Sequence, residues 1–402
     1  MILKMKKKCS RIAIVAMYPF PNGMAATNRI LAYGKGLVEN GIEVSYFACL
    51  PPTKENLHYV PDSLYKGISC HYSYHRTKGN NKITSILRSS VSLLLSVTNL
   101  GKHHRKIPYD YLFISSDSIP FLSIFVLTAK MLNLKVVFIG DEYPGSMRTK
   151  LRSQLTLSES VLYKILHKGI DYRVLMTDYL IFFYNSYISY KPTYKLPSII
   201  DLDRFKKKDI LENNKKYICY MGSMDLSKDN IDNIIKAYFL IYRDFHDIEL
   251  HFYGIPSHKD IQYLISIINN LHLEGKVIFK KNVLYNEVPI ILKNAYILVT
   301  SQPQTKRTEG GFSTKLGEYL MSGRPTLLTD VGEIRKYIKD GENAYLVEPC
   351  NPQAYANKLK YIIEHYDEAL LVAQKGKEYV STTFSHSAVA SDLLLFLNKH
   401  LE

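Results

Sequence analysis

Three kinds of pattern are missing from this sequence of 402 residues. Its five cysteines form no CxxC pair and no metal-ligand spacing, which argues against a zinc module or a disulfide framework and favours a reducing compartment. It contains no short repeat or low-complexity tract, which excludes solenoids and fibrous proteins. No apolar run reaches the ~18 residues of a membrane-spanning helix. The longest candidate, 119–134, is interrupted by Ser123, Thr128 and Lys130.

A secretory leader is also not expected, although the chain starts like one. Four lysines within residues 4–8 precede the apolar run 12–17. That run is short, and residues 19–23 end it without a small-residue cleavage site. We therefore expect no signal peptide and a cytoplasmic protein.

Acidic residues are scarce in the first half only. Residues 1–200 hold 26 basic and 11 acidic side chains, whereas residues 201–402 hold 26 of each. Such an asymmetry predicts that one half meets a negative surface, either nucleic acid or an anionic membrane, with a plain solvated surface as the alternative. No RNP, KH or zinc motif supports nucleic-acid binding.

Strand-like apolar runs alternate with helical periodicity along the chain. In the first half, we expect strands at 11–18, 43–48, 109–115 and 135–139, and helices at 26–40 and 119–132. In the second half, we expect strands at 217–221, 249–253, 277–280, 296–300, 326–329 and 344–347, and helices at 231–245, 261–271, 287–293 and 313–322. This alternation predicts two α/β domains with parallel sheets, joined by the charged, turn-rich linker 192–216.

The residues best suited to ligand binding are EGGFSTKLGEYLMSGRP at 309–325. In open parallel sheets, ligands bind where strands lead into helix N-termini. Ser313 can cap the helix, and the first-turn amides with Lys315 form an anion site suited to phosphate. Glu318, about a turn after Thr314, can accept hydrogen bonds from two ribose hydroxyls. A capped helix with a surface glutamate is the alternative.

Several motifs of the second half follow one another along the chain in the same order as in one enzyme family. A turn at Gly222 precedes Lys228, Gly254 follows the next strand, and the stretches 330–333 and 340–349 follow the glutamate segment. This order resembles the donor-binding domain of retaining GT-B glycosyltransferases of family 4, the glycosyltransferase group 1 type. The loop 19–23, rich in proline and glycine, gives the first half a weaker resemblance to the family's acceptor domain.

The resemblance implies a GT-B fold, with two Rossmann-like domains facing across a cleft. Residues 1–200 would form the acceptor-side domain, 201–384 the donor-binding domain, and 385–402 a helix packing back towards the N-terminal domain. The enzyme would move a sugar from a nucleotide diphosphate sugar to a saccharide or polyprenyl-linked saccharide, with retention, in bacterial capsule, exopolysaccharide or lipopolysaccharide synthesis. No cofactor is implied, and no DxD-like carboxylate pair indicates a metal.

Transferred to this sequence, the family's motif assigns the diphosphate to Lys228 and Lys315 and the ribose to Glu318. The remaining donor-side positions are Gly222, Ser223, Gly254, Glu309, Gly310, Gly311, Phe312, Ser313, Thr314 and Leu316. Three positions depart from the family pattern: Ser223 stands where an arginine is usual, Gly310 where a first glutamate is usual, and Ser115-Ser116-Asp117 where many members have a histidine.

Loops after strands of the first half supply the other candidates. Asp141 and Glu142 follow a strand directly, and we expect them to contact the acceptor hydroxyl or the donor sugar. Asn22 and Gly23 lie in a small-residue loop that lacks the GxGxxG spacing of a nicotinamide site, and Asp117 lies after the third strand. For each of these loops, a plain turn is the alternative.

The segment 78–106 combines nine large apolar residues with six lysines and arginines. It can lie in a membrane interface with its basic residues towards anionic headgroups, so we expect a peripheral location on the inner face of the plasma membrane. A core helix is the alternative. Two rival functions stay open, a nucleotide-sugar epimerase of the same fold and a basic nucleic-acid-binding protein.

Overall fold

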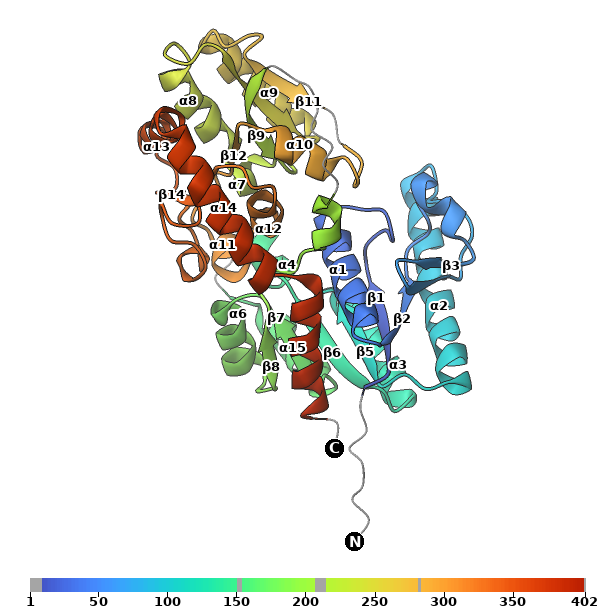
Figure 1. Cartoon of the computed structure of the whole chain (residues 1–402). Coiled ribbons are helices and arrows are strands. Elements are labelled where there is room, and N and C mark those ends of the chain that lie inside the picture. The colour runs from blue at the N-terminus through green and yellow to red at the C-terminus, as the bar shows by residue number, and fades with distance from the viewer. Residues whose placement is uncertain (1–8, 150–153, 207–214, 281–282, 401–402) are drawn as a thin grey trace. The chain divides into compact units, whose positions relative to one another are not determined.

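The computed structural model describes residues 9–149, 154–206, 215–280 and 283–400. The lysines at 4–8 and residues 207–214 of the predicted linker lie outside these ranges. The chain divides into two compact domains, one formed by Met1–Asp201 with Ser385–Glu402 and the other by Leu202–Phe384 (Figure 1).

An eight-stranded sheet forms the centre of the N-terminal domain, in the order β3-β4-β2-β1-β5-β6-β7-β8. The strands are β1 Arg11–Ala16, β2 Glu43–Ala48, β3 Asp62–Tyr65, β4 Ile68–Tyr72, β5 Tyr111–Ser115, β6 Lys135–Gly140, β7 Tyr172–Leu175 and β8 Thr193–Lys195. All pairs are parallel except β3 with β4. In β1, Ile12 lies beside Val44 and Tyr111, and all three are buried, as expected for a strand covered on both faces.

Helices cover this sheet. They are α1 Ala25–Glu39, α2 Lys82–Lys106, α3 Ile119–Met131, α4 Gly145–Thr149, α5 Leu157–Lys168, α6 Asp178–Phe183 and α15 His386–Asn398, with a short 3₁₀ helix η1 Lys54–Tyr59 and a π-helical turn η2 Tyr184–Ile188. The sequence pattern predicts β1, β2, β5 and β6 but not the other four strands. Among these, β3 and β4 join through Lys66 and Gly67, both at positive φ, as a two-residue hairpin requires.

The last helix, α15, packs on α1. At Gly36 the two backbones are so close that a Cβ atom would lie 2.1 Å from the carbonyl oxygen of His386. Asn40 also donates to the Ser387 carbonyl at 3.0 Å, and the Tyr111 hydroxyl donates to the Leu397 carbonyl at 3.0 Å. The C-terminal segment is therefore a structural part of the N-terminal domain.

Six parallel strands form the C-terminal sheet in the order β11-β10-β9-β12-β13-β14. They are β9 Lys216–Met221, β10 Ile248–Tyr253, β11 Val277–Lys280, β12 Ile297–Val299, β13 Thr326–Thr329 and β14 Tyr345–Val347, and all six were predicted. The helices are α7 Leu226–Asp229, α8 Ile231–Ile241, α9 His258–Asn270, α10 Val288–Asn294, α11 Lys306–Gly310, α12 Thr314–Met321, α13 Pro352–Glu364 and α14 Tyr366–Thr383, with 3₁₀ turns η3 Leu202–Phe205 and η4 Ile334–Lys336.

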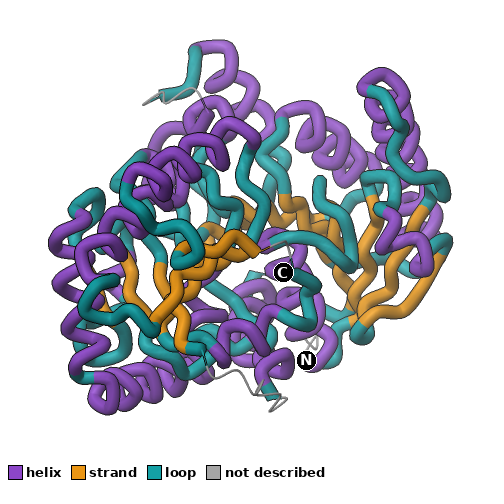
Figure 2. The backbone as a smooth tube through the Cα atoms, turned by 90° about the horizontal axis from the view of Figure 1, so that it is seen from above, coloured by secondary structure: helices purple, strands orange, loops and turns teal. Residues whose placement is uncertain are grey.

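The strand order reverses between β9 and β12, because the chain moves from β9 to β10 on one side and returns to β12 on the other. Ligands of open α/β sheets bind outside the carboxyl ends of strands at such a reversal. Figure 2 shows the strands of each sheet lying among helices, which leaves the strand ends and their loops as the places where a site can form.

Candidate functional site

Two glycines allow the backbones that follow β9 and β10 to lie very close to each other at the carboxyl ends of these strands. The Gly222 amide donates to the Tyr253 carbonyl at 2.9 Å. Gly254 has φ +143°, and a Cβ atom there would lie 1.9 Å from the Gly222 carbonyl oxygen. Both glycines were predicted as donor-side residues. The backbone requires glycine at 254, whereas at 222 a Cβ atom would meet the side chains of Lys315 and Tyr220.

Lys315, in the first turn of α12, extends across Gly222. A Cβ atom at Gly222 would lie 2.5 Å from the Lys315 Cε and Nζ atoms. The ammonium donates to the Asp229 carboxylate at 2.8 Å and to the Tyr220 hydroxyl at 2.8 Å, and it lies 4.4 Å from the centre of the Tyr220 ring. Since an ammonium has three donors, one remains for a ligand.

Asp229 is the buried anion that holds this lysine. Its other carboxylate oxygen accepts from the Ser223 hydroxyl at 2.7 Å, and its side chain has no exposed surface. Burial acts to raise the pKa of Asp229, but attraction to Lys315 and the hydrogen bonds from Lys315 and Ser223 outweigh it, so the pKa falls to about 2. Burial lowers the pKa of Lys315, and Asp229 opposes this effect.

Lys228 supplies a second ammonium close by. It is on α7, next to Asp229 in the chain, and its charge contributes to lowering the pKa of Lys315. No carboxylate within the described ranges forms an ion pair with Lys228. Lys228 is therefore the ammonium that a ligand can engage without breaking an existing contact.

The N-terminus of α12 is open to a ligand. Ser313 occupies the N-cap position, but its side chain makes no capping bond, so the predicted cap was wrong. Thr314 begins the helix, and the hydroxyl of Tyr319 fixes the helix to the end of β9 by accepting from the Met221 amide at 2.8 Å. First-turn amides that no side chain caps are suited to an anion.

Glu318 is held by an arginine that the sequence analysis missed. The Glu318 carboxylate accepts a short charge-assisted hydrogen bond from Arg204 on η3. Arg204 also donates to the Tyr285 carbonyl at 2.7 Å, and its guanidinium lies 3.7 Å from the centre of the Tyr285 ring. Arg204 thus orients the Glu318 carboxylate, which was predicted to bind ribose, and the second carboxylate oxygen takes no part in the hydrogen bond with Arg204.

Three predicted donor-side positions have other roles. The Leu316 side chain is fully buried in the core, so it packs inside the domain. The Phe312 ring packs against Tyr337 at 5.0 Å, and the Gly311 amide donates to the Arg307 carbonyl at 2.8 Å. The Phe312 side chain and the Gly311 amide are therefore committed to the domain itself.

Glu309, one position before the place where the family usually has its first glutamate, makes a local contact. Its carboxylate forms an ion pair with Lys306 on the same short helix, α11. Gly310 ends that helix and is buried. A Cβ atom at Gly332 would lie 2.1 Å from the Thr308 carbonyl, so the loop after β13 presses directly on α11.

In the N-terminal domain, Asp141 and Glu142 follow β6 as predicted. Asp141 lies 3.2 Å from Nε of Arg29, which is almost completely buried and donates to the carbonyls of Leu196 and Pro197. Asp141 therefore neutralises a structural arginine. Glu142 is half-buried at the same edge of the sheet.

The loop after β1 is fixed by its neighbours. The Asn22 amide donates to Asn56 at 3.0 Å, and Asn56 donates back to the Asn22 carbonyl at 3.0 Å. A Cβ atom at Gly23 would lie 2.2 Å from the Thr27 hydroxyl. Asp117, after β5, accepts a hydrogen bond from Tyr163 at its carbonyl. These residues lie at the carboxyl edge of the N-terminal sheet.

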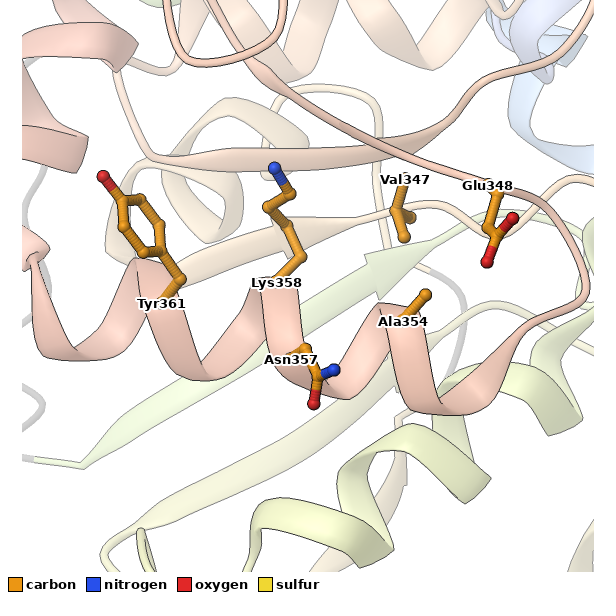
Figure 3. A pocket seen from close by; sticks show the side chains of 6 residues that line it. All are labelled: Val347, Glu348, Ala354, Asn357, Lys358 and Tyr361. Atoms are coloured by element: carbon orange, nitrogen blue, oxygen red, sulfur yellow. The ribbon is translucent and has the colours of Figure 1, made fainter.

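A separate open hollow of about 570 Å³ lies beside α13 and the end of β14. Figure 3 shows Glu348, Lys358 and Tyr361 around it. Lys358 already pairs with Asp340 at 2.8 Å, and Glu348 accepts from Asn351. None of the predicted site residues lines this hollow.

Residues 201–379 match the family model described as glycosyl transferases group 1. These residues make up nearly the whole C-terminal domain, so that domain belongs to the group 1 family. All donor-side positions of the group 1 pattern, from Gly222 to Glu318, lie within the matched range, whereas Asp141, Glu142 and the loop at Asn22 lie outside it.

Relatives of this group 1 chain agree with the match. A poly(ribitol-phosphate) alpha-N-acetylglucosaminyltransferase of Staphylococcus aureus is 24% identical over 185 residues, which are 46% of this chain and 36% of that protein. The matched stretch therefore spans about a third of that curated relative.

Solved structures resemble this group 1 chain over nearly its whole length. Sucrose-phosphate synthase from Thermosynechococcus elongatus has a TM-score of 0.76 and 15% identity, covering 97% of this chain and 99% of that chain. Anabaena HepE in complex with UDP and glucose has a TM-score of 0.72 and 12% identity, covering 96% of this chain and 99% of that chain. The predicted GT-B fold is confirmed.

Proposed function

We propose that the protein transfers a sugar from a nucleotide diphosphate sugar to a hydroxyl of an acceptor. One observation carries this proposal: Lys228 and Lys315 converge beside the open first turn of α12, where the strand order of the sheet reverses. Two ammonium groups and free amides suit a diphosphate, and Glu318 lies about a turn further along α12, where a ribose can follow.

The chemistry requires little covalent help from the protein. The bond between the sugar carbon and the phosphate oxygen breaks, the acceptor oxygen bonds to that carbon, and the acceptor proton leaves. Negative charge grows on the departing diphosphate, so donors aimed at its oxygens stabilise the transition state. Charge-assisted hydrogen bonds from Lys228 and Lys315 are about twice as strong as neutral ones.

The donor class is proposed from the relatives. Because HepE was solved with UDP and glucose, a UDP-sugar is the first donor to test. For the acceptor, we propose a saccharide or polyprenyl-linked saccharide of a bacterial surface polymer, made in the cytoplasm with retention at the sugar carbon. The name of the Staphylococcus aureus relative describes transfer to a ribitol-phosphate polymer, which supports a polymer as acceptor but not a saccharide in particular.

A thermal-shift screen of nucleotide diphosphate sugars tests the donor. At a hundred times the dissociation constant, the matching donor should stabilise the protein by about 2.7 kcal/mol. For a domain of this size, that corresponds to a rise in Tm of roughly 5 to 10 °C. If no nucleotide sugar or nucleoside diphosphate raises the Tm, the proposal is wrong. A donor whose sugar is inverted without any acceptor would instead identify an epimerase.

Glu318 can be tested separately from the lysines. The variant Glu318→Ala should bind UDP about 10- to 100-fold more weakly, since it loses a charged acceptor for the ribose hydroxyls. It should bind pyrophosphate normally, because pyrophosphate has no ribose. Isothermal titration of both ligands makes the comparison, with Glu364→Ala on α13 as the control. Equal losses for both ligands would mean that the change disturbs the helix that carries Lys315, and would remove the assignment of Glu318 to the ribose.

A further inference from the structure

Helix α2 exposes large apolar side chains and buries small ones. Ile83 is 79% exposed, and Leu87 and Leu94 are also exposed. The residues that α2 buries are Ser92, Ser96, Leu100 and Gly101. A helix on the surface of a soluble protein normally has the opposite arrangement, with its apolar stripe against the core.

The buried side of α2 is where it meets its own domain. Here the helix packs on β2 and α3, and the Ser96 hydroxyl donates to the Leu93 carbonyl at 2.7 Å and lies 3.5 Å from the Cys49 sulfur, which follows β2. Figure 1 shows α2 along the edge of the domain beside β2. The alternative of a core helix was therefore wrong, because only Leu100 of the nine predicted apolar residues is buried.

The neighbouring helices extend this apolar surface. Met131 on α3 is 86% exposed and Leu157 on α5 is 83% exposed, and Leu127 and Ile165 are exposed on the same two helices. Helix α3 contacts both α2 and α5. Exposed side chains in a layer of helices point away from the sheet beneath them. We call the exposed apolar residues of α2, α3 and α5 the helical face.

The helical face has positive charge at its border. No aspartate or glutamate occurs between Asp62 and Asp110, whereas eight lysines and arginines do. Positions 83, 87, 91, 94, 98, 102 and 105 follow one another at steps of three or four residues, so they share one side of α2. Lys102 and Arg105 therefore lie on the same side of α2 as the exposed apolar residues, near its C-terminal end.

We propose that the helical face docks on an anionic lipid bilayer. Its apolar side chains would enter the boundary between headgroups and acyl chains, while Lys102 and Arg105 would meet lipid phosphates. Helix α2 is long and apolar enough to cross a membrane. It instead lies in the membrane plane, because one side stays on β2 and Arg88 lies within its length. This inference goes beyond the proposed sugar transfer, which needs no membrane.

Vesicle sedimentation tests the proposal with the full chain. The probes are vesicles of phosphatidylcholine alone and of phosphatidylcholine with one third phosphatidylglycerol. The protein should sediment with the second kind at low salt. Combining Ile83→Ser, Leu87→Ser and Leu94→Ser should weaken binding by about tenfold or more. Removing the charges of Lys102 and Arg105 with Lys102→Gln and Arg105→Gln should cost about fivefold each.

Matched controls come from equally exposed residues of the C-terminal domain. Ile255→Ser with Leu371→Ser, and Lys259→Gln with Lys375→Gln, make changes of the same kind away from the helical face and should leave sedimentation unchanged. Titration with UDP should be the same in all variants, which separates docking from the proposed function.

Four results would overturn the proposal. The first is no sedimentation with anionic vesicles. The second is equal losses in the α2 variants and their controls. The third is a dimer, detected by light scattering, that becomes a monomer when Ile83, Leu87 and Leu94 are changed, while vesicle binding stays the same. In that case the helical face would join two copies of the chain. The fourth is that alkaline extraction fails to release the protein from the vesicles, because α2 would then span the membrane and not lie on its surface.

Discussion

The variant Asp229→Asn should lower the free energy of unfolding of the C-terminal domain by about 3–5 kcal/mol, the usual effect of removing one partner of a buried ion pair. Lys315 would lose the carboxylate that it contacts at 2.8 Å, and the Ser223 hydroxyl would lose its charged acceptor. Urea unfolding followed by circular dichroism measures the change. Loss of UDP binding should accompany it, since the Lys315 ammonium would no longer be held across Gly222.

Two companion variants make this result specific. Asp232→Asn removes a surface ion pair with Lys236 on α8 and should cost no more than about 0.5 kcal/mol. Adding Lys315→Met to Asp229→Asn removes the unpaired buried charge, so most of the stability should return while UDP binding stays lost. If Asp229→Asn is as mild as Asp232→Asn, the ion pair does not support the domain.

The same ion pair gives a signed dependence on pH. The pKa of Asp229 is lowered from 3.8 to about 2 on folding, so the ionised carboxylate stabilises the folded state above pH 3.8. That contribution should disappear as the pH falls through 3.8 towards 2. Urea midpoints across this range should fall less steeply for Asp229→Asn than for the natural chain.

The variant Lys228→Ala should bind both UDP and pyrophosphate about 10- to 100-fold more weakly, the usual value of a hydrogen bond between charged groups. Its stability should be unchanged, because no ion pair within the described ranges involves Lys228. Titration calorimetry measures the affinities, and thermal unfolding checks the fold.

Lys236→Ala, on the neighbouring α8, is the matched control and should bind both ligands normally. The contrast with Glu318→Ala is diagnostic: loss of Lys228 should affect both ligands, and loss of Glu318 should affect UDP alone. Normal pyrophosphate binding by Lys228→Ala would remove Lys228 from the diphosphate site and leave that role to Lys315.

The sequence predicted the elements that carry the site better than the contacts within it. Lys315 was expected at the site from its place in the first turn of a helix, and Gly222 and Lys228 were expected there from the resemblance to the family. Asp229 was missed because nothing in the sequence pairs it with Lys315, 86 positions later. Arg204 was missed for the same reason, since it reaches Glu318, 114 positions later, from η3 within the predicted linker 192–216.

The errors have equally local causes. Consecutive residues of a helix point in directions about 100° apart, so Leu316 faces the core when Lys315 faces the strand ends. The periodicity of α2 predicted a helix correctly, but it did not show which side the domain would cover. Asp141 was predicted as a site residue without knowledge that Arg29, on α1, needs a buried counter-charge.

The packing of α15 on α1 has a consequence for biosynthesis. A chain leaves the ribosome from its N-terminus, and domains generally fold as units. Here the N-terminal domain requires residues 385–402, which are synthesised after the whole C-terminal domain. The domain that is made first therefore matures last, and until then the surface of α1 that α15 covers is accessible to chaperones.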